Sequence, residues 1–556
     1  MTTMLKRVLF IVLAIFAFAC TGCHRKAKHQ EVYPILPSLQ ITMTSLQYDS
    51  ILNNQENKVP VFALLLDAQG DTLFQGKSYF KTRGNDSFKE RKKPFTIKFP
   101  KKQKLFELNR NKTFVLLANA CDESHIRNAI GLDMARAFGL PASNYTYLTL
   151  YINGSYKGLY QMTNKVDVGK NALDITDLDK LNEWANPNPL ETYEWYGHGR
   201  KKQVIQRKGV LLDNNPDDIT GGYLLDNVGP PSQYSKTLSG FVSDAEDNVR
   251  ILSPKYASPQ ELDYISKRYN EMEAAVHAPD GNHPVTGQHY SEYLDVESFA
   301  RYYLLNELLE NADGGWASFM MYKDTDTKDP KFYAGPAWDY DRILDNPRFR
   351  GNSIAFENEI KVNEKKGIIG VAFSGGLLHH LCQHLDFQQA VRNAYVNVLS
   401  PICHDYLERS PFDSLVALLS HEADQDNMVN KTRHSGDYET AVVRATSFLR
   451  KRIEFLDWYY STNEDEQVLV YYESENEKTR KFYYPLGEAI QAPQLEVLYN
   501  HTAIYEMFIP GTDSIVSDGT VFQTSQKLEL RKREPTKREV QIRRVKKKLR
   551  KIGLDF

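Results

Sequence analysis

The chain has 556 residues, a length that allows two to four folding units. Hydrophobic residues make up 41% of it and charged residues 25%, with 33 Tyr and 27 Phe, a composition that excludes a disordered protein. The formal charge of -2 conceals a basic C-terminus, because residues 531–551 hold 12 Lys or Arg against two Glu. We therefore expect a folded protein with a separate cationic tail.

The N-terminus has the pattern of an export signal. Lys6 and Arg7 precede the 12-residue apolar run VLFIVLAIFAFA, which is too short to span a bilayer. The stretch AFACTGC at its end is similar to a bacterial lipobox, and either Cys20 or Cys23 fits the lipidated position. We expect a lipoprotein signal peptide over 1–23, a tether over 24–37 and a lipid-anchored protein of the bacterial cell envelope, on the periplasmic face or the cell surface. An uncleaved signal anchor is the alternative.

The remaining cysteines exclude two common kinds of small scaffold. Only Cys121, Cys382 and Cys403 follow the signal, an odd number without CxxC spacing. Neither a disulfide framework nor a zinc site is indicated.

The N-terminal part of the chain is expected to consist mainly of β-strands. Short β-prone runs separated by Gly, Asn and Asp turns lie between about residues 39 and 99. A helix with one apolar face follows between Ile126 and Phe138. The dipeptide Asn153-Gly154, placed between two β-rich runs, then predicts a hairpin.

The second part is mostly helical, over 259–311 and 376–460, with two short strands, SFMMYKD and KFYAGPAWDYD, between the helical stretches. We thus predict a two-lobed α+β domain over 38–460. Residues 465–530 return to β propensity and predict a small β-rich domain. Residues 531–556 predict a basic amphipathic tail, which suits an anionic membrane surface, although a merely solvated tail fits equally well.

Three acids and a basic stretch carry the candidate chemistry. Asp313, Asp339 and Asp341 fall within 29 residues, each beside a turn or a strand, and WDYD places alternate acids on one face of an expected strand. Phosphoryl transfer needs a base for the incoming hydroxyl and oxygen ligands for Mg2+. The stretch KTRGNDSFKERKKPFTIKF supplies positive charge that suits phosphate oxygens, although a solvated basic hairpin is the commoner origin of such a run.

Six ordered stretches together resemble the CotH kinase family of atypical secretory kinases: KTRGNDSFKERKKPFTIKF, FVLLANACDESHIRNAIGLDMARAFGL, LYINGSYKGLYQMTNKVD, GGYLLDN, NELLENADGGWASFMMYKD and GPAWDYD. The resemblance runs from about residue 38 to 460. It implies a diverged protein-kinase-like fold and phosphorylation of protein hydroxyls with ATP and Mg2+.

The resemblance also assigns roles to individual residues. Asp313 would be the catalytic acid that orients and deprotonates the acceptor hydroxyl. Metal binding would fall to Asp339, with Asp341 beside it, and to Ser318, which stands where the family usually has Asn. Nucleotide phosphate would be bound by Arg83 together with Lys93 or Lys98.

A second departure from the family pattern keeps another function open. Asn164 occupies a place where members usually carry Glu, so the acidic partner of a phosphate-binding Lys is missing, unless Asp226 of GGYLLDN replaces it. The two hypotheses are a kinase that acts on an envelope protein and a non-catalytic kinase-fold protein that binds or assembles envelope components. Neither involves nucleic acid as a partner.

Overall fold

The computed structural model describes residues 35–187, 192–199, 203–210, 212, 214–228, 239–311, 313–315, 317–344, 346, 362–363, 376–409, 411–430, 437–461, 467–473, 479–485, 504–516, 520–522 and 526–534. The expected signal peptide with Cys20 and Cys23, most of the tether, and the tail beyond residue 534 lie outside this part. Among the described helices, none is both long and apolar enough to cross a membrane.

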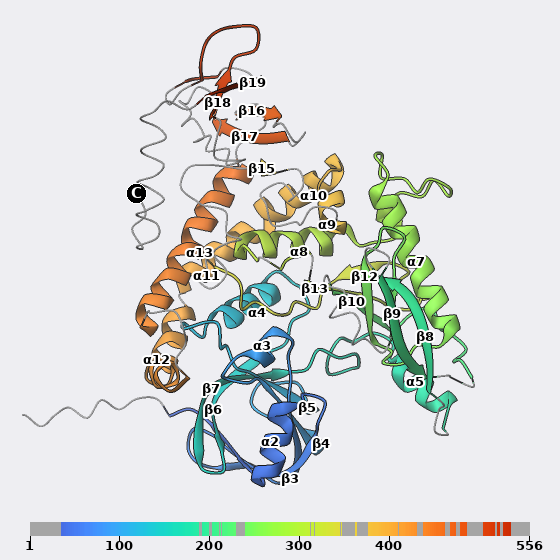
Figure 1. The fold of residues 1–556 in the computed structure, drawn as a ribbon, viewed down its shortest axis with the longest axis vertical. Helices are drawn as coiled ribbons and strands as arrows, with labels where there is room; N and C mark the ends of the chain where they lie inside the picture. Colours follow the sequence, from blue (N-terminus) through green and yellow to red (C-terminus); the bar gives the residue numbers. More distant parts are fainter. Residues whose placement is uncertain are drawn as a thin grey trace, which may run out of the picture.

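The N-terminal strands close into a seven-stranded barrel, drawn in blue and teal in Figure 1. Their order is β1-β2-β3-β4-β5-β7-β6, and the barrel closes where β1 pairs with β6 in parallel. The strands are β1 (Ser38–Thr42), β2 (Val59–Leu66), β3 (Thr72–Thr82), β4 (Phe95–Gln103), β5 (Asn111–Leu117), β6 (Tyr145–Ile152) and β7 (Ser155–Asn164). Helix α2 (Ser45–Asn53) joins β1 to β2, and the short helix α3 (Asp86–Lys89) lies between β3 and β4.

Alternation of apolar side chains builds the interior of the barrel. Along β2, Val59, Val61, Ala63 and Leu65 are buried, whereas the residues between them are exposed or half-buried. The mixed helix and strand content agrees with the expected α+β class. A closed barrel does not by itself establish the protein-kinase-like two-lobed fold that the resemblance implied.

A second sheet and a group of helices form the rest of the domain. The sheet has the order β11-β12-β10-β13-β14. Its strands are β10 (Tyr223–Val228), β11 (Ser239–Val242), β12 (Asn248–Ser253), β13 (Ala317–Lys323) and β14 (Phe332–Ala334). The hairpin of β8 (Thr192–Gly199) and β9 (Gln203–Val210) lies beside it, as does α5 (Leu178–Ala185) (Figure 1).

The helices of this part share one large apolar core. They are α4 (Arg127–Ala137), α7 (Pro259–His277), α8 (Val296–Leu309), α9 (Leu377–Leu381), α10 (Leu385–Ala394), α11 (Ser400–Arg409), α12 (Pro411–Asn430) and α13 (Tyr438–Ser461). A π-helical turn, Tyr395–Leu399, joins α10 to α11. The expected helix between Ile126 and Phe138 and the hairpin at Asn153-Gly154 are confirmed.

A buried ion pair joins the barrel to α12, which packs against β7. Lys92 Nζ lies 2.8 Å from Asp426 Oδ1, and the two side chains are 2% and 0% exposed. The same carboxylate accepts a hydrogen bond from the Leu159 amide at 2.8 Å. At Gly158 an added Cβ would lie 1.9 Å from Asp426 Oδ1, so the close approach of helix and strand requires glycine there.

The four C-terminal strands and the short strand β15 form a separate sheet of order β15-β17-β16-β19-β18. Its strands are β15 (Val362–Asn363), β16 (Gln467–Glu473), β17 (Thr479–Pro485), β18 (Ile504–Phe508) and β19 (Gln526–Arg533). Strand β19 includes residues 531–533, with which the basic tail was expected to begin. Domain boundaries at residues 460 and 530 stay a prediction.

Candidate active site

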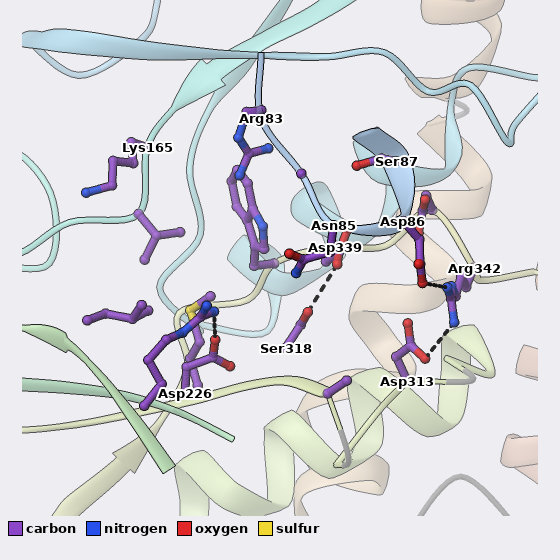
Figure 2. A pocket seen from close by; sticks show the side chains of 18 residues that line it. Arg83, Asn85, Asp86, Ser87, Lys165, Asp226, Asp313, Ser318, Asp339 and Arg342 are labelled. Atoms are coloured by element: carbon purple, nitrogen blue, oxygen red, sulfur yellow. Dashed lines mark hydrogen bonds and ion pairs between the residues drawn. The ribbon is translucent and has the colours of Figure 1, made fainter. Parts of the chain in front are cut away.

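A cavity of about 410 Å³ lies between the barrel, the second sheet and the turn that follows α8 (Figure 2). This volume is within the range of small-ligand sites. Its walls hold five carboxylates and four cationic side chains: Asp86, Asp226, Asp313, Asp339, Asp341, Arg83, Lys165, Arg250 and Arg342. The cavity therefore suits a ligand that carries both negative charge and metal ions.

Asp313 reaches the cavity from the turn at the C-terminal end of α8. Its backbone amide donates to Asn311 Oδ1 at 3.1 Å, and its carboxylate accepts from Arg342 Nη1 at 3.1 Å. The Asp313 side chain is only 13% exposed. Burial raises the pKa of Asp313 to about 6, and Arg342 opposes that rise. A carboxyl group with such a pKa is suited to accept a proton near neutral pH.

Asp339 and Asp341 lie in a loop, and the expectation that WDYD forms a strand is wrong. Strand β14 ends at Ala334, and the following Pro336 has no amide hydrogen to donate to a neighbouring strand. Asp339 has a φ of 70°, in the left-handed region, which no strand allows. The alternating acids are thus presented by a turn and not by a pleated strand.

The acids of this loop meet Ser318 at the start of β13. Ser318 Oγ donates to Asp339 Oδ2 at 3.1 Å (Figure 2). Asp341 is half-buried, and its desolvation, together with the nearby Asp339 carboxylate, raises its pKa well above the usual range. Close carboxylates of this kind are favoured by a cation between them.

The oxygen donors present fit Mg2+. Two carboxylates and a hydroxyl are the hard ligands that this ion prefers, and Mg2+ usually keeps water and phosphate oxygens in its remaining positions. Among the described residues no three His, Cys, Asp or Glu side chains converge as they would in a metal cage made of protein alone. Because Mg2+ keeps phosphate oxygens among its ligands, the two carboxylates and the hydroxyl suit a metal that arrives together with phosphate.

Helix α4 holds the acidic loop in place. Tyr340 N donates to Asn128 Oδ1 at 2.8 Å, and Arg127 Nε donates to Ile343 O at 2.9 Å. Arg127 also pairs with the buried Asp122. A Cβ added to Gly131 would lie 2.3 Å from Tyr340 Cγ, so the tyrosine ring packs directly on the helix backbone.

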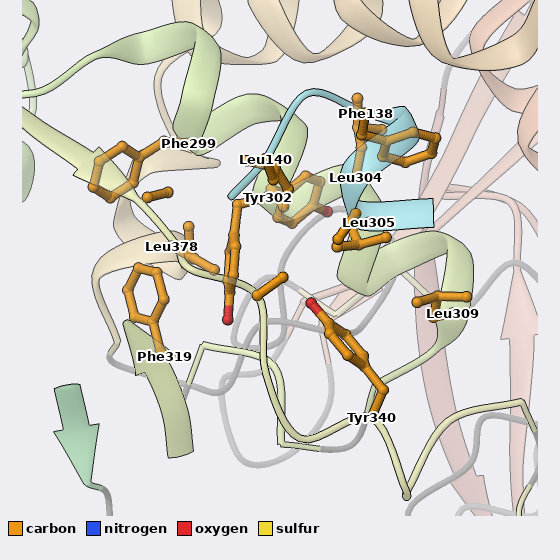
Figure 3. Close-up of a cluster of buried hydrophobic side chains, with 14 of the residues drawn as sticks. Phe138, Leu140, Phe299, Tyr302, Leu304, Leu305, Leu309, Phe319, Tyr340 and Leu378 are labelled. Carbon is orange, nitrogen blue, oxygen red and sulfur yellow. The ribbon is translucent and has the colours of Figure 1, made fainter. Parts of the chain in front are cut away.

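Tyr340 ties the same loop to the apolar core. Its ring is fully buried among side chains of α8, α4 and β13, which include Tyr302, Leu305 and Phe319 (Figure 3). Since Tyr340 stands between Asp339 and Asp341 in the chain, its burial fixes the position from which both carboxylates project.

The structure separates the three basic residues expected to bind phosphate. Arg83 lines the cavity, with its guanidinium 5.7 Å from the Trp338 ring centroid. Lys93 and Lys98 do not belong to the lining: Lys93 Nζ donates to Phe88 O, and Lys98 is exposed on β4 opposite Thr113.

A family model for the CotH kinase protein matches residues 80–456, more than half of the chain. The chain belongs to the CotH kinase family. This confirms the resemblance and indicates a kinase-like protein. A search of curated proteins finds no match.

In this CotH domain Asn164 has a structural role in the barrel. Its amide forms two hydrogen bonds of 2.8 Å with the backbone of Asn109, and it does not belong to the lining of the cavity. Asp226 lines the cavity and pairs with Arg250.

Sequence reasoning did not single out Lys165, Arg250, Arg342 or Asp86 as site residues of the CotH domain. Arg342 follows WDYD directly, Asp86 lies in the basic stretch KTRGNDSFKERKKPFTIKF, and Lys165 follows Asn164, so these three carried a local signal. Arg250 lies outside the quoted stretches, and its place in the cavity depends on the tertiary fold.

Proposed function

We propose that the protein is an atypical kinase that transfers phosphate from Mg-ATP to hydroxyl groups of envelope proteins. One observation carries the proposal: Asp313, from the turn after α8, and the acids of WDYD line the same cavity together with Arg83 and Arg342. A base, oxygen ligands for Mg2+ and cations for phosphate are the parts that phosphoryl transfer requires. A diverged protein-kinase-like fold belongs to this proposal.

In the proposed reaction, Asp313 accepts the proton of the acceptor hydroxyl. The hydroxyl oxygen bonds to the γ-phosphorus while the bond from that phosphorus to the bridging oxygen breaks, so a phosphoester and ADP result. Asp339, Asp341 and Ser318 would hold Mg2+, which when bound neutralises charge on the phosphate oxygens. Arg342 orients the Asp313 carboxylate, and Arg83 contributes positive charge beside Asp339.

The proposed place of action is the cell envelope. The N-terminal pattern with Cys20 or Cys23 supports export and lipid anchoring, and the basic tail supports a further contact with anionic lipid. A Cys20→Ala, Cys23→Ala double variant should lose labelling by a fatty-acid probe. Undiminished labelling would refute the anchor.

The second candidate is a non-catalytic protein that binds or assembles envelope components through the same fold. It is favoured by Ser318, a weaker metal ligand than the Asn usual at this place, and by Asn164, whose amide is occupied by the backbone. The low ATP content expected outside the inner membrane also favours it.

Transfer of labelled γ-phosphate from Mg-ATP, with the protein itself and an envelope extract as acceptors, separates the two candidates. A kinase requires that Asp313→Ala and Asp339→Ala abolish transfer while thermal unfolding stays cooperative. Asp263→Ala, a change of the same size at an exposed position of α7 outside the cavity, should retain transfer. If wild type neither binds Mg-ATP nor transfers label, the kinase function must be abandoned.

A further inference from the structure

An ion pair of the second sheet lines the cavity. Asp226 on β10 and Arg250 on β12 are directly opposed across the two strands, and Arg250 Nη2 donates to Asp226 Oδ2. The Asp226 side chain is 2% exposed and that of Arg250 is 28% exposed. Both residues line the cavity. The acid is thus enclosed, while the guanidinium reaches the space where a ligand would lie.

Two atoms of this pair lack partners among the described residues. Arg250 Nε and Asp226 Oδ1 are buried and form no hydrogen bond there. Buried donors and acceptors are nearly always satisfied, because leaving one unpaired costs free energy. The two unpaired atoms are themselves closed to solvent, whereas the exposed part of the Arg250 side chain can donate to phosphate oxygens in the cavity.

The pair joins a cation to an acid, as the phosphate-binding pair of protein kinases does. Protein kinases hold a phosphate-binding Lys in place through an ion pair with Glu. Here Lys93 and Lys98 lie off the cavity, and Asn164 is bonded to the barrel backbone. The guanidinium fork also fits phosphate oxygens better than an ammonium group does, because it donates from several nitrogens in one plane.

We infer that Arg250, held in position by Asp226, grips the phosphate chain of the nucleotide in this cavity. This inference rests on the proposed function, since it names the binding residue and the positioning residue for the same Mg-ATP. The placement on two paired strands fixes the guanidinium on a rigid element. Leu252, two residues further on the same strand, lines the cavity as well and offers an apolar surface next to the phosphate contact.

The test is calorimetric binding by the full chain of three probes: Mg-ATP, Mg-tripolyphosphate and adenosine. Arg250→Gln should weaken both phosphate ligands about tenfold or more, the loss of a charged hydrogen bond, and leave adenosine unchanged. Asp226→Asn should weaken them less. In the Arg250→Gln background, Asp226→Asn should have no further effect, because a positioning residue acts only through the group it positions.

Two controls separate binding from folding. Lys98→Gln removes the same charge from the outer face of the barrel and should bind all three probes as wild type does. The double variant Asp226→Asn, Arg250→Gln leaves no buried charge uncompensated, so it should keep the wild-type unfolding temperature while still binding phosphate weakly.

The outcomes distinguish this inference from the function on which it rests. If wild type binds Mg-ATP and Arg250→Gln binds it within twofold, the inference is wrong and the proposed function stands. Equal weakening by Lys98→Gln would also overturn it, because the effect would then come from net charge. If wild type binds neither Mg-ATP nor Mg-tripolyphosphate, both are wrong.

Discussion

Replacing Arg342 with Gln should move the acidic limb of the phosphate-transfer rate to higher pH by about one unit. In the wild type, burial raises the pKa of Asp313 to about 6 and Arg342 opposes that rise from 3.1 Å. The general base must be deprotonated, so the rate should rise as the pH passes through the pKa of Asp313. Without the guanidinium the carboxylate is harder to form, so the acidic limb of the pH–rate profile moves to higher pH.

The magnitude follows from the partial burial of the pair. Arg342 is 25% and Asp313 13% exposed, so their interaction lies between a surface ion pair, worth up to about 1 kcal/mol, and a buried one, worth about 3 kcal/mol or more to break. About 1.4 kcal/mol corresponds to one pKa unit. A metal ion bound at Asp339 would offset the repulsion from that acid. The acidic limb of the rate profile would then lie at lower pH in the wild type and in the variant alike.

The assay is the initial rate of transfer from saturating Mg-ATP between pH 5 and 9. Asp86→Asn provides a control of opposite sign: Asp86 raises the pKa of Asp313 and competes for Arg342 at 3.6 Å, so its removal should move the limb to lower pH. If the limb of Arg342→Gln stays at the wild-type pH or moves down, Asp313 is not the group whose ionisation controls the rate.

Three further predictions concern the framework of the site. Because the pKa of Asp341 is raised in the folded state, its ionised form opposes folding as the pH rises. Asp341→Asn should therefore raise the unfolding temperature at pH 7.5 in EDTA, by about 2 to 4 °C for each kcal/mol recovered. The same variant should lose the stabilisation that Mg2+ gives to the wild type. Gly131→Ala should displace Tyr340, cost about 1 to 3 kcal/mol in denaturant unfolding and weaken Mg2+-dependent nucleotide binding. Lys92→Met should cost about 3 to 5 kcal/mol in the same measurement by leaving the buried Asp426 without its lysine partner, with most of the loss recovered when Asp426→Asn is added.

Local patterns predicted the elements that depend on neighbouring residues. The helix that ends before Gly139 and the hairpin at Asn153-Gly154 were predictable because their signals are short-range. Closure of the barrel was not, since it depends on the pairing of β1 with β6, more than 100 residues apart in the chain, and alternating apolar residues suit open and closed sheets alike.

Some residues of the candidate site could likewise be predicted from local sequence, and others could not. The acids could be chosen because Asp313 follows a helix and WDYD is short and distinctive, and the structure brings them to one cavity. The basic stretch was a poorer guide, because β4 alternates its side chains and turns Lys98 to the outside. Arg250 gave no signal, since its importance comes from a cross-strand neighbour 24 residues earlier in the chain.

The charge balance of the cavity bears on the choice between enzyme and binding protein. Asp341 is half-buried close to Asp339, which raises its pKa, and Asp313 is held by a single arginine, so the ionised acids lower the stability of the ligand-free fold. A protein that used this region only as a surface for assembly would gain stability from neutral residues at these places. A ligand that brings cations would repay the repulsion on binding, and in the proposed function nucleotide with Mg2+ would do so, with Arg83 and Arg250 facing its phosphates. Under the proposed function, the departures at Ser318 and Asn164 would alter how the nucleotide is held, whereas the acids that would serve the chemistry remain in place.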